Sequence, residues 1–154
     1  MRTNTWTNAD GLVVGFGRAN TRNPEAGVIE TKGNLRQVEL EVYYDMDAAT
    51  ANVKSAVIPA GAVITSATIS VSEAFVGGTS VDVGTIGTDG TGADADAIDT
   101  ALTAALTKGA VIEADGAAIG AMVAADVNLT FATTGTFTAG RASVFVEYIM
   151  PSAK

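Results

Sequence analysis

The chain has 154 residues and a mass of 15.5 kDa, a size that fits one domain with its own hydrophobic core. It contains no histidine and no cysteine, which excludes His-dependent catalytic triads, thiolate nucleophiles, disulfides and Cys/His zinc sites. The formal net charge of −8 argues against nucleic acid and anionic membranes as partners, because both bind clustered Lys and Arg. We therefore expect a soluble protein that is not an enzyme and uses no cofactor.

The kinds of apolar residue favour strands over helices. The chain has 28 Ala, 20 Thr, 17 Val and 17 Gly but only 6 Leu. β-branched residues suit pleated strands and glycine suits the turns between them, whereas a helical bundle needs Leu, Lys and Glu in quantity. The composition predicts a mainly β protein. The N-terminus lacks the apolar run of a signal peptide, and the longest run of small apolar residues, Ala117–Ala125, is about half a membrane span.

The first 36 residues differ in character from the rest. A polar segment, Met1–Asp10, and a short apolar run, Leu12–Gly17, precede a loop rich in Asn, Arg and Gly. Residues 18–36 are locally basic and suit docking on an acidic partner, although an ordinary polar surface loop explains them about equally well. We predict an extended N-terminal arm and loop over residues 1–36 and a folded domain over 37–154. The candidate partner-binding residues are Trp6, Arg18, Arg22, Lys32 and Arg36.

Alternation of apolar and polar residues predicts three strands in the middle of the chain, at Gln37–Asp45, Val63–Ser72 and Ser80–Ile86. Residues 57–62 predict a strand end and a turn. In the first strand the expected core face consists of Val38, Leu40, Val42 and Tyr44. In the second strand, one face consists of Val63, Thr65, Ala67, Ile69 and Val71.

One helix is predicted, over Asp94–Leu106. Ile98, Leu102 and Leu106 recur at the spacing of one helical face. Acidic residues at the start suit the positive end of the helix dipole, and Lys108-Gly109 is a typical helix end.

The last third is again predicted as strands, with turn residues between them. The expected strands are Ala110–Ile112, Ala117–Val123, Val127–Ala132 and Arg141–Ile149. In the final strand, one face consists of Ala142, Val144, Val146 and Tyr148. About eight short strands predict an antiparallel β-sandwich of jelly-roll type, with one short helix and the N-terminal arm.

Two sets of acidic residues resemble known sites in part, one a calcium site and the other the carboxylate pair of a glycosidase. Four aspartates, at positions 89, 94, 96 and 99, suggest calcium, but the Gly and distal Glu of an EF-hand loop are missing. An acidic helix start explains them better, and a weak surface calcium site stays open. Glu39 and Glu41 share one strand face, as the carboxylates of a glycosidase would. The scarcity of aromatic residues favours a solvated sheet face instead.

Two stretches carry a family resemblance. Trp6–Gly17 (WTNADGLVVGFG) resembles the opening of small virion proteins from tailed bacteriophages. Ile58–Val71 (IPAGAVITSATISV), followed by Ser80–Gly87 (SVDVGTIG), is similar to a sequence motif that recurs in phage head proteins. The final predicted strand, Arg141–Ile149, fits the same pattern. The chain is thus similar to the capsid decoration, or cement, proteins.

The resemblance implies a small β-rich protein that forms homotrimers and clamps neighbouring major capsid subunits. It implies a place on the exterior of the virion capsid, after synthesis in the host cytoplasm, and brings no catalytic residues. The alternative function is a receptor- or carbohydrate-binding β-sandwich module of a phage tail or an adhesin. That alternative needs exposed aromatic platforms, and the Trp and Tyr residues are few: Trp6, Tyr43, Tyr44 and Tyr148.

Overall fold

The structure is a computed structural model that describes residues 4–7, 13–16, 35–47, 51, 54–102 and 106–151. The chain divides into two units, Met1–Lys32 and Gly33–Lys154. In the first unit, β1 (Asn4–Thr7) and β2 (Val13–Phe16) pair antiparallel, so part of the apolar run after Gly11 is a strand.

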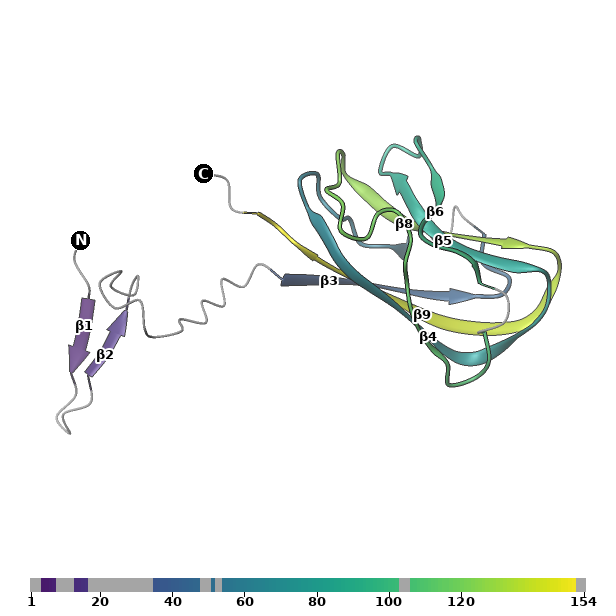
Figure 1. The fold of residues 1–154 in the computed structure, drawn as a ribbon, viewed down its shortest axis with the longest axis horizontal. Coiled ribbons are helices and arrows are strands. Elements are labelled where there is room, and N and C mark those ends of the chain that lie inside the picture. The colour runs from purple at the N-terminus through teal and green to yellow at the C-terminus, as the bar shows by residue number, and fades with distance from the viewer. Residues whose placement is uncertain are drawn as a thin grey trace. The chain divides into compact units, whose positions relative to one another are not determined.

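The second unit consists of two antiparallel sheets (Figure 1). The larger sheet has the order β3-β9-β4-β7, with β3 at Leu35–Tyr43, β9 at Phe137–Ile149, β4 at Val63–Gly77 and β7 at Val111–Glu113. The smaller sheet has the order β6-β5-β8, with β6 at Asp94–Leu102, β5 at Ser80–Gly87 and β8 at Val127–Thr134. The long strands β4 and β9 curve through the larger sheet (Figure 1).

This strand order is that of a jelly roll in which the second strand is shortened to a single bridge among the described residues. In an eight-stranded jelly roll, the second strand pairs with the seventh at the edge of one sheet. Here the described residues between β3 and β4 contribute one antiparallel bridge at that place, from Ile58 to Val127 of β8. The mainly β sandwich expected from the sequence is therefore confirmed, with three strands in its smaller sheet.

The hydrophobic core lies between the two sheets. Both sheets contribute alternate residues to one cluster, as a sandwich requires. From the larger sheet these are Val38, Leu40, Val42, Ile64, Ala67, Ile69, Val71, Ala142, Val144, Val146 and Tyr148; from the smaller sheet they are Val81, Val83, Ile98, Leu102, Leu129 and Phe131. The predicted core faces of β3 and β9 are confirmed, except that Tyr44 lies beyond the end of β3 and is 37% exposed.

The predicted helix is wrong, because Asp94–Leu102 is strand β6. Ile98 and Leu102 are four residues apart, and an even spacing satisfies a strand as well as a helix. Both side chains are buried, and β6 pairs with β5 through an irregular register. Helical hydrogen bonds occur elsewhere: Ala51 N–H donates to Asp47 O and Ser55 N–H donates to Ala51 O, each at 3.0 Å.

The prediction that Val63 and Thr65 share one face of β4 with Ala67, Ile69 and Val71 is wrong at the beginning of the strand. A register shift between Ile64 and Ser66 places Ile64 inside the sandwich and leaves Thr65 exposed. An extra residue in one strand reverses the face of every residue on one side of it. Beyond the shift, Ala67, Ile69 and Val71 are buried as predicted.

The predicted strand Ala117–Val123 is also wrong: residues 117–120 form turns, and the segment 114–123 crosses between the sheets. On the larger sheet, N–H groups of this segment donate to carbonyls of β4 and of residue 62, which immediately precedes β4. On the smaller sheet, they donate to carbonyls of the edge strand β6. One segment thus protects strand edges in both sheets, which limits edge-to-edge association. The donor and acceptor pairs are Ala114–Ala67, Gly120–Ile64, Val123–Ala62, Gly116–Ile98 and Ala118–Ala97.

Candidate functional site

The predicted partner-binding residues lie in both units. Trp6 is in β1, opposite Val14. Arg36 is in β3, opposite Tyr148 of β9, and its side chain is exposed. Arg18, Arg22 and Lys32 lie outside the described residues. The binding role of the five residues, and the arm over residues 1–36, stay predictions.

A polar cluster that the sequence analysis missed lies on the outer face of the larger sheet. Arg141 Nε donates to Glu41 Oε1 at 2.7 Å and Nη2 also forms an ion pair with Glu41, while Tyr43 Oη donates to Glu41 Oε2 at 2.5 Å. The Arg141 guanidinium lies 4.9 Å from the centre of the Tyr43 ring, and Lys54 Nζ lies 5.2 Å from it. Cations at these distances are attracted to the ring face.

This cluster bears on the carboxylate pair of Glu39 and Glu41. The hydrogen bond from Tyr43 and those from Arg141 lower the pKa of Glu41. A glycosidase needs one carboxyl with a raised pKa to protonate the leaving group. The environment of Glu41 has the opposite effect, so its geometry favours a surface ion pair over acid catalysis.

The four aspartates of the acidic segment do not converge. Asp89 Oδ1 accepts hydrogen bonds from N and Oγ1 of Thr91, at 2.9 and 2.8 Å. A hydrogen bond with the Asp96 side chain raises the pKa of Asp94, and burial is the second, smaller cause of the increase. Among the described residues, no group of three or more acidic side chains is placed to hold a metal ion.

Asp99 is the buried member of this segment, with 5% of its surface exposed. Burial raises the pKa of Asp99, and the charge of Asp115 adds to the increase, while a 2.8 Å hydrogen bond from Thr100 N opposes it. A raised native pKa means that the folded chain binds the proton more tightly than the unfolded chain. The contribution of Asp99 to the free energy of unfolding therefore falls as pH rises from its pKa in the unfolded chain through its pKa in the folded chain.

We expect Asp99→Asn to remove this pH dependence. The amide is isosteric and uncharged, so the variant and the parent should unfold at similar urea concentrations near pH 3, and the variant should be the more stable at pH 7. Urea unfolding at both pH values measures the difference. A stability difference that is the same at both pH values would contradict this account.

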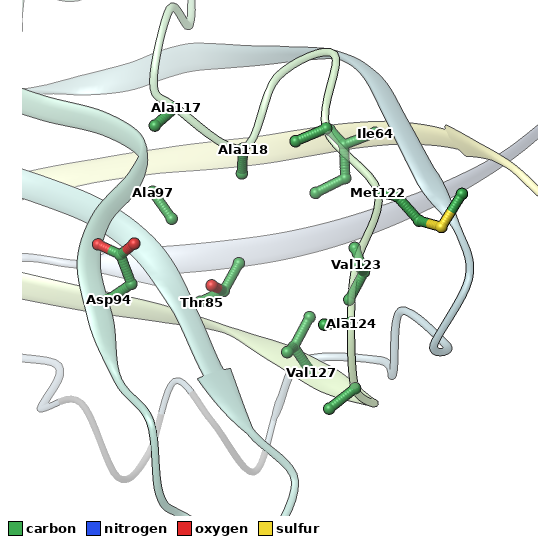
Figure 2. Close-up of a pocket in the computed structure, with 12 residues that line it drawn as sticks. Ile64, Thr85, Asp94, Ala97, Ala117, Ala118, Met122, Val123, Ala124 and Val127 are labelled. Carbon is green, nitrogen blue, oxygen red and sulfur yellow. The ribbon is translucent and has the colours of Figure 1, made fainter.

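A shallow apolar groove of about 330 Å³ lies beside the crossing segment (Figure 2). Most of its described lining side chains are alanine, valine and methionine, and among them the Asp94 carboxylate is the one ionisable group. Such a lining offers no pair of groups for acid–base or nucleophilic chemistry. Within the described residues, no helix has the length and hydropathy needed to cross a membrane.

Aromatic platforms are few in the described part of the chain. Tyr148 is buried in the core, and the Tyr43 ring is approached by the two cations described above. Tyr44 is partly exposed. A glycan-binding face usually stacks sugars on open aromatic rings, so no described surface favours that alternative.

Comparison with solved structures places the fold in two phage capsids. A chain of the acidic stable capsid structure of Helicobacter pylori bacteriophage KHP30 is similar with a TM-score of 0.59 and 14% identity, over 77% of this chain and 89% of that one. A chain of the cyanophage Pam1 capsid asymmetric unit is similar with a TM-score of 0.53 and 19% identity, over 77% of this chain and 86% of that one. The fold is shared. No protein-family model and no curated protein matches the sequence.

Proposed function

We propose that this chain is a non-enzymatic virion structural protein that decorates a phage capsid and stabilises it by clamping neighbouring major capsid subunits. The observation that carries the proposal is the fold, which chains of two phage capsid structures share over 77% of this sequence. The site chemistry supports it, because the carboxylates of Glu41, Asp89 and Asp99 are engaged in an ion pair or in local hydrogen bonds rather than arranged for catalysis.

The proposed binding element is the arm, with Trp6, Arg18, Arg22, Lys32 and Arg36 as contacts. Residues 1–36 carry five cations and three acids, whereas residues 37–154 carry four cations and fourteen acids. The arm is therefore the part of the chain that an acidic shell surface repels least. The protein would act as a homotrimer on the capsid exterior after synthesis in the host cytoplasm, since symmetric association covers exposed strand edges.

Two measurements test this function. Light scattering across a dilution series is expected to give about three times the chain mass, as a closed trimer requires. Co-sedimentation with empty capsids of the phage whose genome encodes the chain is expected to show saturable binding. A chain that stays in the supernatant at every concentration would overturn the proposal, whatever its oligomeric state.

We expect deletion of residues 1–10 to weaken capsid binding and leave the sandwich folded. The deletion removes β1 and Trp6 but no residue of the core between the two sheets. Co-sedimentation measures the affinity and circular dichroism measures the fold. Deletion of residues 152–154 is the control, with no expected change in binding. Unchanged affinity after the N-terminal deletion would show that the arm is not the contact.

A further inference from the structure

The strand β3 is at one edge of the larger sheet and, among the described strands, pairs with β9 alone. From Leu35 to Glu41, its other edge bonds no backbone group among the residues that the structure describes. An open edge of this length is a template for another strand unless something covers it or discourages pairing.

One hydrogen bond shows which backbone groups point outward. Tyr44 N–H donates to Gly140 O at 3.0 Å, in the same register as the β3–β9 ladder. Because bonded and non-bonded pairs alternate in an antiparallel ladder, the even-numbered residues of β3 bond β9. The N–H and C=O groups of Gln37, Glu39 and Glu41 therefore point to the open edge.

The same three residues carry side chains on the outer face, where all three are exposed. Glu41 is held by Arg141 and Tyr43, whereas Glu39 makes no ion pair with a described residue. A strand added at this edge would place one of its residues directly opposite Glu39, with the two Cα atoms about 5.5 Å apart. Opposite charges at such positions stabilise the pair and like charges destabilise it.

Pairing with a second copy is disfavoured by these charges. When two β3 strands pair antiparallel along their whole length, residue 39 is at the centre and the two Glu39 carboxylates face each other. A partner strand with a cation at that position would have the opposite effect.

We propose that the open edge of β3 binds an extended segment of a capsid subunit as an added strand, with a Lys or Arg opposite Glu39. The inference rests on the capsid-binding function proposed above and names the mode of contact. Main-chain hydrogen bonds to Gln37, Glu39 and Glu41 would give affinity, and the charge at residue 39 would give the register.

The test uses Glu39→Pro in the full chain, with empty capsids of the same phage as the probe. Proline removes the outward N–H of residue 39 but no bond to β9, and edge strands tolerate it there. Val111→Pro is the matched control. The bond from Val71 N to Ala110 O, in register with β4–β7, places the N–H of residue 111 on the open side of β7, and Val111 is 68% exposed.

We expect Glu39→Pro to weaken capsid binding at least tenfold and Val111→Pro to leave it unchanged. Glu39→Lys keeps the N–H group and reverses the charge, so it should weaken binding even if the proline variant fails to fold. On capsids, the amides of Gln37, Glu39 and Glu41 should exchange more slowly with deuterium than in the free protein.

Four outcomes would overturn the proposed contact. If Glu39→Pro folds and binds like the parent, or if the three amides exchange equally fast on capsids, the edge is not the contact and the decoration function still stands. If Glu39→Pro dissociates the trimer, the occupant is a second copy. If the parent protein does not bind capsids, the proposed function fails together with this inference.

Discussion

Replacing Phe131 with alanine is expected to lower the free energy of unfolding by about 3–5 kcal/mol, as measured by urea denaturation. Phe131 is fully buried in β8, between the sheets. Its ring centre lies 6.5 Å from that of Phe75, which contacts Phe137 edge-on at 5.7 Å. Removal of the ring leaves a cavity among groups on both sheets, and a packed sandwich collapses around it only in part.

Phe145→Ala is the control for this prediction. Phe145 is on the outer face of β9, opposite Glu39 and Thr68, and is half-buried. The substitution removes the same atoms but makes no internal cavity, so the loss should be clearly smaller. Equal losses for the two variants would show that the core does not depend on Phe131 in this way.

Gly84→Ala is expected to destabilise the fold by about 3 kcal/mol through overpacking. A Cβ at residue 84 would lie 1.9 Å from the carbonyl oxygen of Asp94 and 2.5 Å from the carbonyl carbon of Ala95. Both atoms belong to the backbone of β6, so the two strands must move apart to admit a methyl group. Thermal or urea unfolding measures the loss.

Gly61→Ala separates this steric effect from backbone strain. Gly61 has a φ of 82° and no atom within 4 Å of an added Cβ, so alanine there meets open space in an unfavourable conformation. That strain amounts to about 1–2 kcal/mol. A loss at residue 61 equal to or greater than the loss at residue 84 would contradict the close approach of β5 and β6.

The elements that the sequence predicted well are those whose alternation is unambiguous. β3 and β9 present apolar residues at every second position, and this pattern fixes both the strand and its buried face. The spacing of Ile98 and Leu102 fits both the helical period of about 3.6 residues and the two-residue period of a strand, so it does not distinguish a helix from a strand. In β4, the register shift after Ile64 depends on pairing with β9, which is remote in sequence.

The candidate site was less predictable than the fold for the same reason. Glu41 and Arg141 are 100 positions apart, and their ion pair depends on the β3–β9 register. The outward direction of the N–H groups of Gln37 and Glu39 follows from that register too. The local excess of Arg and Lys over residues 18–36 was visible from composition alone, but composition does not say what these residues contact.

The position of β9 between β3 and β4 has a consequence for synthesis on the ribosome. β9 is translated after every other described strand, yet it is the partner on which both β3 and β4 depend. Until residue 149 has left the exit tunnel, the larger sheet has no centre, and the exposed edges of β3 and β4 remain open to other nascent chains. The sandwich therefore closes late, and contacts between distant segments make that step slow compared with local folding.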